Sequence, residues 1–332
     1  MPVKIGMCFP RELPAPLIAT FATALDGGGA DDLWVIEDCF YTAGISLAAT
    51  ALARSERLTV GIGILPAVAR NPAITAMEIA TLAQLAPGRV IAGIGHGVQE
   101  WMGQMGVRRA SPLAALEETL IMVGRLLDGE NVTFDGDTWH LNDVELSVPP
   151  VVRPPILAGV RGPKSMAIAG RCADGVVLAE FSGPTAVRAA LAAAGNPSPF
   201  AVAVFAAVHI DGDRRTAREW VAPWLAAMVA TPPLGLRQAP FFADLVRLIE
   251  QHGPAGLVTM PNEWWTELAA VGTPDDVLAH IDALASAGVD RIGLFPSPEP
   301  DVALTQLALV TAHLLNPPRS LDAARRNGAG SP

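Results

Sequence analysis

Cysteine is scarce in this 332-residue chain, which contains only Cys8, Cys39 and Cys172. No two of them form a CxxC pair, so the sequence offers no cysteine framework for a metal and is typical of a reducing compartment. The histidines show no metal-ligand spacing with carboxylates. We therefore expect no metal site.

Long hydrophobic runs and an excess of basic residues are also missing. A membrane-spanning helix needs about 20 apolar residues, and no uninterrupted run reaches that length. Residues 1–10 lack the apolar stretch of a signal peptide, so we expect a cytoplasmic protein. The net charge of −10 argues against nucleic-acid and anionic-membrane partners. The expected partner is a small-molecule substrate, and we also expect a homodimer.

Short β-branched segments alternate with longer helical patterns along most of the chain. Hydrophobic residues make up 51% of the sequence, which is enough for one large core. Such alternation is typical of βα units around a parallel sheet, and eight units favour a closed barrel over an open sheet. The strands are expected at residues 3–9, 32–37, 58–64, 90–95, 155–159, 175–179, 200–210 and 290–295, with helices between them, for example at 72–86, 112–128 and 274–287.

The fold class predicted from this pattern is α/β, a single-domain (β/α)8 TIM barrel over residues 1–316 with insertions. One insertion, about 130–153, is expected to form a hairpin that turns at Asp135-Gly136. The other, about 231–272, is expected to contain two short amphipathic helices. Residues 317–332 are expected to be a weakly ordered tail.

A glycine-rich segment, Gly93-Ile94-Gly95-His96-Gly97, follows the fourth predicted strand. It reads GxGxG where a dinucleotide fingerprint needs GxGxxG, and three βα units precede it. Glycines at the end of a barrel strand allow a flat ligand to approach the backbone closely. The alternative is that these glycines serve packing alone.

A second candidate segment, Gly159-Val160-Arg161-Gly162-Pro163-Lys164, ends a strand and opens a helix. Backbone N–H groups at a helix N-terminus, with Arg161 and Lys164 nearby, form an anion site. Pro163 is equally explained as an ordinary first residue of a helix. The pattern alone leaves both interpretations open.

Acidic and aromatic residues supply the candidates for chemistry. Glu37 and Asp38 end the second predicted strand, where a barrel places groups for proton transfer or for cofactor binding. Neighbouring strand residues face opposite sides, so at most one is expected to line the site if strand geometry persists through both. His96 is a third acid–base candidate, although a lone loop histidine is more often simply solvated. Two roles remain open for a further set of side chains, as walls of a ligand pocket or as ordinary core packing: Trp101, Met102, Met105, Trp264 and Trp265.

Several motifs occur in an order that resembles the bacterial-luciferase-like superfamily, in particular its coenzyme F420-dependent, methylenetetrahydromethanopterin reductase-like branch. The resemblance covers nearly the whole chain. It rests on Val60-Gly-Ile-Gly63-Ile64, Arg70-Asn71-Pro72, Gly88-Arg89, the glycines of 93–97, Arg161-Gly162-Pro163-Lys164, Ala173-Asp174-Gly175, Gly272-Thr273-Pro274-Asp275 and Gly288-Val289-Asp290.

The resemblance implies a cofactor ring at the C-terminal mouth of the barrel. It implies a cis peptide at Gly63–Ile64 behind that ring and a phosphate cradle formed by residues 159–164. Asp38, Glu37 and His96 are then the candidate catalytic residues. The expected cofactor-binding residues are Cys8, Gly63, Ile64, Gly95, Gly97, Gly159, Val160, Arg161, Gly162, Pro163 and Lys164.

Departures from the family pattern limit what carries over. The methanopterin reductases have an acid where this chain has Cys8, an Asp-His pair where it has Glu37-Asp38, and an acid where it has Val98. We expect an F420-dependent oxidoreductase acting on another small organic substrate. One alternative is an FMN-dependent monooxygenase supplied with reduced flavin by a partner reductase. A lesser alternative is a non-catalytic flavin-binding paralogue.

Overall fold

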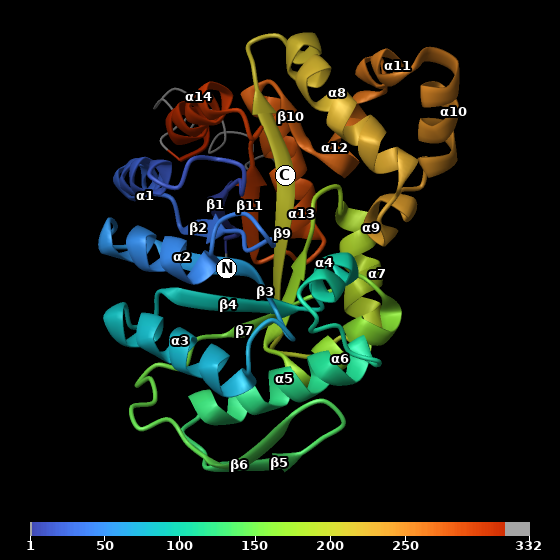
Figure 1. The fold of residues 1–332 in the computed structure, drawn as a ribbon. Helices are drawn as coiled ribbons and strands as arrows, with labels where there is room; N and C mark the ends of the chain where they lie inside the picture. The colour runs from blue at the N-terminus through green and yellow to red at the C-terminus, as the bar shows by residue number, and fades with distance from the viewer. Residues whose placement is uncertain (1, 316–332) are drawn as a thin grey trace, which may run out of the picture.

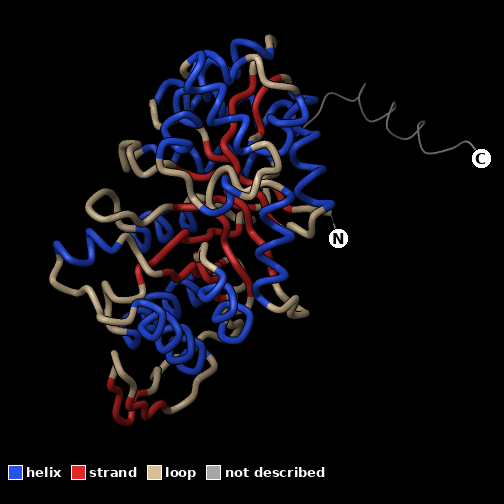
Figure 2. Tube along the Cα trace, turned by 90° about the vertical axis from the view of Figure 1, so that its right-hand side faces the viewer, coloured by secondary structure: helices blue, strands red, loops and turns tan. Residues whose placement is uncertain are grey.

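Eight parallel strands form a closed barrel in the computed structural model, which describes residues 2–315. Each strand pairs with the next, and the ring closes because β8 pairs with β9 and β11 pairs with β1. Figure 2 shows the strands at the centre, surrounded by helices. The strands are β1 (Lys4–Phe9), β2 (Asp32–Val35), β3 (Thr59–Pro66), β4 (Val90–Gly95), β7 (Ile156–Gly159), β8 (Gly175–Leu178), β9 (Ala201–Ile210) and β11 (Arg291–Phe295).

The predicted (β/α)8 TIM barrel is therefore confirmed, and all eight strand positions agree closely with those expected. Helices connect the strands and bury their apolar faces against the barrel (Figure 1). They are α1 (Leu17–Gly28), α2 (Gly44–Ala53), α3 (Pro72–Leu85), α4 (Gln99–Gln104), α5 (Pro112–Leu127), α6 (Pro163–Cys172), α7 (Pro184–Ala194), α8 (Arg214–Ala230), α13 (Pro274–Ser286) and α14 (Pro300–Val310), followed by the π-helix η1 (Thr311–Leu315).

Two additions interrupt the simple repeat, at the places expected from the sequence. Strands β5 (Val132–Asp135) and β6 (His140–Val144) form an antiparallel hairpin, seen below the barrel in Figure 1. The second addition differs from the expectation of two helices, since four short ones occur there. They are α9 (Leu234–Arg237), α10 (Phe242–His252), α11 (Pro254–Val258) and α12 (Asn262–Leu268).

The sequence analysis did not predict one of the strands. Residues Ala270–Gly272 form β10, which pairs only with the end of β9 and extends the sheet outside the closed ring. A three-residue strand is too short to produce a periodic pattern. The tail expected at 317–332 lies outside the described residues.

Large aromatic side chains fill the barrel interior beside glycines. Trp34 and Phe205 meet edge to face, with ring centroids 5.3 Å apart. A Cβ atom at Gly61 would lie 2.3 Å from the Trp34 ring, and one at Gly63 would lie 2.5 Å from the Phe205 ring. The glycines of β3 therefore leave the space that these two aromatic residues occupy.

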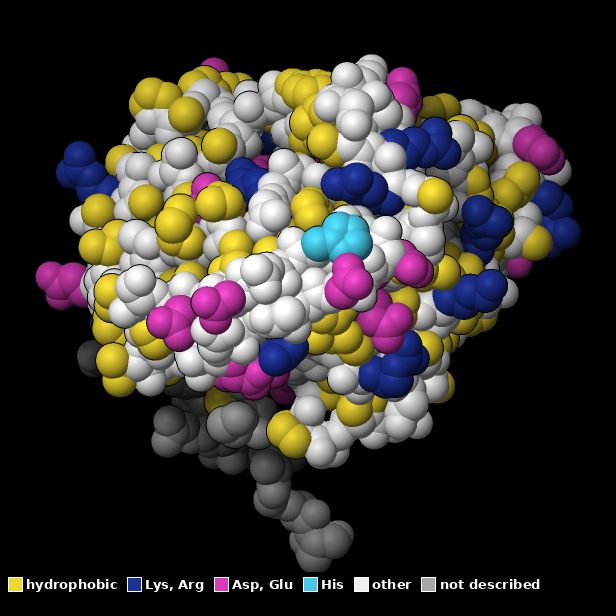
Figure 3. Space-filling model, turned by 60° about the horizontal axis from the view of Figure 1, so that its bottom comes forward, with side chains coloured by type: hydrophobic (Ala, Val, Ile, Leu, Met, Phe, Trp, Pro, Cys, Tyr) yellow, Lys and Arg dark blue, Asp and Glu magenta, His cyan; other side chains and the backbone are white. Residues whose placement is uncertain are grey.

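The outer surface carries charges of both signs. On the face at the hairpin end of the molecule, acidic and basic side chains are interspersed, and apolar ones are scattered among them (Figure 3). Among residues 2–315, no helix is long and apolar enough to cross a bilayer.

Candidate active site

Three neighbouring cavities lie at the C-terminal ends of the barrel strands. The inner cavity, of about 350 Å³, is lined by Glu37, Asp38, Ile64, Pro66, His96, Gly97, Val98, Trp101, Gly159, Val160, Arg161, Gly162, Ser165, Val177, Ala179 and Phe205. The outer cavity, of about 660 Å³, shares Asp38, Val98, Trp101 and Arg161 with it. The side cavity, of about 210 Å³, shares Val160, Arg161 and Ala179 with the inner one. Arg161 borders all three.

The back of the inner cavity is formed by Ile64. The Gly63–Ile64 peptide bond is cis, as the resemblance predicts, and Cys39–Phe40 is a second non-prolyl cis bond that the sequence did not indicate. The pairing of β3 with β4 shifts register between Ile62 and Leu65, so Ile64 sits in a bulge.

Three glycines surround the Ile64 side chain. A Cβ atom would lie 2.9 Å from an Ile64 methyl group at Gly93, 2.5 Å at Gly95 and 2.4 Å at Gly159. The sequence left open whether such glycines admit a ligand or serve packing, and Gly159 both lines the inner cavity and packs against Ile64. At Gly159 the missing side chain makes room for Ile64, which itself lines the cavity. At Gly93 and Gly95 a Cβ would first meet the backbone oxygens of Ile62, at 2.3 Å, and Gly159, at 2.4 Å, and then Ile64.

Replacing Gly159 with alanine is expected to destabilise the protein by about 1–3 kcal/mol, because the new methyl group overlaps Ile64 Cγ2. The cost should shrink when Ile64→Ala removes that atom. Nothing lies within 4 Å of a Cβ at Gly162, so Gly162→Ala is a matched control in the same segment. Urea unfolding of the single and double variants measures the free energy of unfolding in each case. An equal loss with and without Ile64 would show that the overlap is not the cause.

Glu37 is held by two partners at the floor of the site. Its carboxylate accepts hydrogen bonds from Arg70 Nη2 at 2.9 Å and from the Gly44 backbone N–H at 2.9 Å. Arg70 also contacts Glu78 at 3.1 Å. Because Glu37 is buried and its oxygens are engaged, it fixes the entry of α2 and the position of Arg70.

Asp38 borders both the inner and the outer cavity. The sequence argument expected only one of the two adjacent acids to line the site. That expectation held only if strand geometry continued through both residues; β2 ends at Val35, and both acids line the inner cavity. Asp38 forms an ion pair with Arg11, which also contacts Glu12 at 2.8 Å and lies 4.4 Å from the Tyr41 ring centroid. Arg11 is a site residue that the sequence reasoning missed.

His96 has both ring nitrogens engaged. Nδ1 lies 3.1 Å from the Pro112 carbonyl oxygen, which can only accept, so Nδ1 carries the proton. Nε2 lies 2.8 Å from Ser165 Oγ, whose hydroxyl then donates to it. Burial lowers the pKa of His96, which keeps the ring neutral near pH 7.

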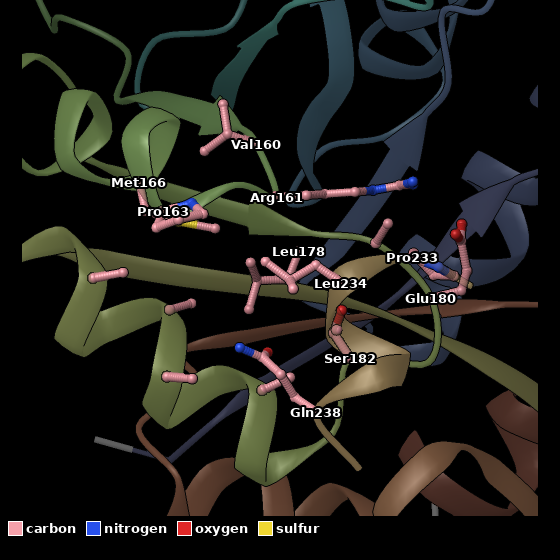
Figure 4. Close-up of a pocket in the computed structure, with 16 residues that line it drawn as sticks. Val160, Arg161, Pro163, Met166, Leu178, Glu180, Ser182, Pro233, Leu234 and Gln238 are labelled. Carbon is pink, nitrogen blue, oxygen red and sulfur yellow. The ribbon is translucent and has the colours of Figure 1, made fainter. Parts of the chain in front are cut away.

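The expected anion loop lies at the junction of the inner and side cavities. Gly162 precedes Pro163, the first residue of α6, and Val160 and Arg161 line the cavities. Arg161 extends toward Glu180 across the side cavity (Figure 4). Lys164 is exposed and is not among the residues that border any of the three cavities.

The positions of Cys8 and Glu180 differ most from what the sequence analysis expected. Cys8 is fully buried in the barrel interior beside Gly293, is not among the cavity-lining residues, and has a pKa raised by burial. Glu180 was not singled out, although it follows β8 by two residues, a typical place for a barrel-site residue. It borders the side and outer cavities, and burial raises its pKa.

Among the aromatic and sulfur candidates, only Trp101 lines the inner and outer cavities. Met102 and Met105 pack in or against the main core. Trp264 and Trp265 belong to a separate cluster under α8 and α10, for which the core interpretation was the right one.

Residues 11–291 match the family described as luciferase-like monooxygenase. The chain belongs to this family. Among luciferase-like relatives, the 5,10-methylenetetrahydromethanopterin reductase of Methanolobus tindarius is 29% identical over 87% of this chain and 93% of its own. The F420-dependent glucose-6-phosphate dehydrogenase of Kineococcus radiotolerans is 26% identical over 95% and 98%. The coenzyme F420-dependent tetrahydromethanopterin reductase of Methanopyrus kandleri shares the luciferase-like fold, with a TM-score of 0.79, 22% identity, and coverage of 95% and 99%.

Proposed function

We propose that this protein is an oxidoreductase that uses coenzyme F420 to reduce or oxidise a small organic substrate. Of two relatives that align over most of the chain, one is named an F420-dependent glucose-6-phosphate dehydrogenase and the other a 5,10-methylenetetrahydromethanopterin reductase. The observation that carries the proposal is the junction at Arg161. There the inner cavity adjoins the side cavity, with which it shares Val160, Arg161 and Ala179. F420 continues beyond its phosphate as an anionic tail and needs such a path.

The residues present fit this cofactor. Ile64, Gly97 and Gly159 would hold the ring, and Arg161 with the N-terminus of α6 would hold the phosphate. When bound, F420 would supply or accept a hydride. Asp38, at the junction of the inner and outer cavities, would transfer the accompanying proton. Glu37 and Arg70 would position the segment that carries Asp38.

The second candidate is a monooxygenase that receives reduced FMN from a partner reductase, which the description of the family favours. FMN ends at its phosphate and needs only the anion site at α6. A non-catalytic flavin-binding protein is a lesser candidate. Turnover of any substrate would eliminate it.

Titration of the purified apoprotein with F420 and with FMN, followed by fluorescence, distinguishes the two cofactors. We expect tighter binding of F420. Arg161→Gln should weaken binding by about 10- to 150-fold, since a hydrogen bond to a charged group contributes about 1.5–3 kcal/mol. Lys164→Gln serves as the matched control and should have a smaller effect, because Lys164 lies away from the cavities. Tight FMN binding without F420 binding would favour the monooxygenase.

A further inference from the structure

Four aromatic side chains from three separate segments line the outer cavity. Trp101 comes from α4, Trp220 and Trp224 from α8, and Phe295 from the end of β11. The Trp224 and Phe295 ring centroids lie 6.0 Å apart. Trp220 is stacked on His209, with centroids 5.4 Å apart and planes inclined by 14°. Flat faces of this kind favour a ligand with a flat hydrocarbon ring.

The charges that border the same cavity do not suit an anion. Among the described residues that line it, Arg11 and Arg161 are basic, whereas Glu12, Asp38 and Glu180 are acidic. Arg11 is paired with both Glu12 and Asp38, so its charge is already neutralised. His209 does not add a cation near pH 7, because burial lowers its pKa. Phosphate sites in proteins present the opposite balance, with clustered Arg and Lys.

Three charged groups of the outer cavity also border its neighbours. Asp38 and Arg161 border the inner cavity as well, and Glu180 borders the side cavity. The wall formed by Trp220, Trp224 and Met228 from α8 is apolar. A ligand with one neutral polar group would therefore place that group toward Asp38 and its ring toward α8.

We propose that the outer cavity binds an uncharged ligand with a flat hydrocarbon ring and a single hydroxyl or carbonyl group, and that it discriminates against phosphorylated ligands. The inference rests on the proposed function in one respect, namely that the cofactor occupies the inner cavity and leaves the outer one to the substrate. The binding preference itself follows from the residues of the outer cavity.

A matched pair of probes tests the preference in the apoprotein by calorimetry. 2-Naphthol and 2-naphthyl phosphate share one ring system and differ by the phosphate. We expect 2-naphthol to bind at least about tenfold more tightly, since an added dianion would enter a partly desolvated site where acidic groups outnumber the arginines, Glu12, Asp38 and Glu180 against Arg11 and Arg161. 2-Naphthyl phosphate can also engage Arg161 and the N-terminus of α6 in the empty cofactor site, so only phosphate binding that weakens in Trp220→Ala is assigned to the outer cavity. Equal or tighter binding of the phosphate there would overturn the proposal.

Variants locate the bound probe. Trp220 lines the outer cavity but is not among the residues of the inner one, and it is 46% exposed, so Trp220→Ala should fold. Loss of its ring should weaken 2-naphthol binding about two- to tenfold. Trp264, stacked on Phe241 at 4.4 Å outside the cavity, provides the control Trp264→Ala. A 2-naphthol affinity that responds equally to both variants, or to neither, would place the probe elsewhere and overturn the proposal.

A gain of binding gives a result that misfolding cannot imitate. Glu12→Gln leaves Arg11 with Asp38 as its remaining acidic partner and should tighten 2-naphthyl phosphate binding about threefold or more. An unchanged affinity for the phosphate would show that the charge balance does not set the preference. None of these measurements needs F420. Failure of the cofactor titration with retained 2-naphthol selectivity would thus disprove the proposed function alone.

Discussion

Replacing Asp38 with asparagine is expected to lower turnover by about 10²–10⁴-fold, the usual contribution of a general acid or base. Asparagine keeps the shape of the side chain but has no transferable proton. Asp38 is the acid that borders both the inner and outer cavities, so a proton on it reaches either one. The pH dependence of kcat/KM should lose one limb in the variant.

Glu12→Gln is the control for an indirect effect through Arg11. Glu12 and Asp38 contact the same guanidinium, but Glu12 is not among the residues that line the inner cavity. We expect Glu12→Gln to lower turnover by less than about tenfold. If turnover fell equally in both variants, the role of Asp38 would be to position Arg11. If Asp38→Asn and Glu37→Gln both kept full turnover and an unchanged pH profile, we would assign proton transfer to Glu180 or His96 instead.

Replacing Arg291 with methionine is expected to destabilise the fold by about 3–5 kcal/mol, the cost of leaving one member of a buried ion pair alone. Arg291 begins β11 and contacts Asp32, which begins β2, so the pair reaches across β1. Asp32 is fully buried. Burial raises its pKa, and Arg291 opposes that rise.

The deficit should depend on pH in a defined direction. Without Arg291, the pKa of Asp32 in the folded state rises further above its unfolded value. Protonation of Asp32 then favours the folded state. The variant's loss of stability therefore shrinks as the pH falls through the pKa of Asp32 in the folded state, and it grows as the pH rises. Urea unfolding at pH 7 and pH 5 measures this change. Arg215→Met, which removes an exposed pair with Glu219, should cost at most about 1 kcal/mol and serves as the control. A deficit equal at both pH values would contradict this account.

The sequence predicted the barrel because each strand and helix carries its own apolar period, which local residues determine. It also placed Asp38, Gly97 and residues 159–162 at one mouth, since strand ends share one edge of a parallel barrel. The sequence did not predict the aromatic side chains that line the outer cavity. Trp220 and Phe295 are 75 positions apart in sequence, and only closure of the barrel brings their segments to the same cavity.

The glycines show a different limit. Sequence alone identified Gly93, Gly95 and Gly159 as positions without a side chain, but it did not show what fills the space. At Gly159 the answer is Ile64, whose side chain comes from β3, two strands away in the barrel. Similarly, the pairing of Glu37 with Arg70 depends on a contact between residues 33 positions apart. Spacing along the chain does not encode such contacts.

The position of Arg161 on all three cavities has a consequence for the order in which ligands bind. When an anionic group engages this guanidinium from the side of α6, the charge no longer serves the outer cavity, whose remaining lining arginine is already neutralised. Occupation of the cofactor site would therefore make the substrate site more acidic. An anionic competitor would bind best to the empty protein and weaken once the cofactor is bound, whereas a neutral substrate would bind before or after it.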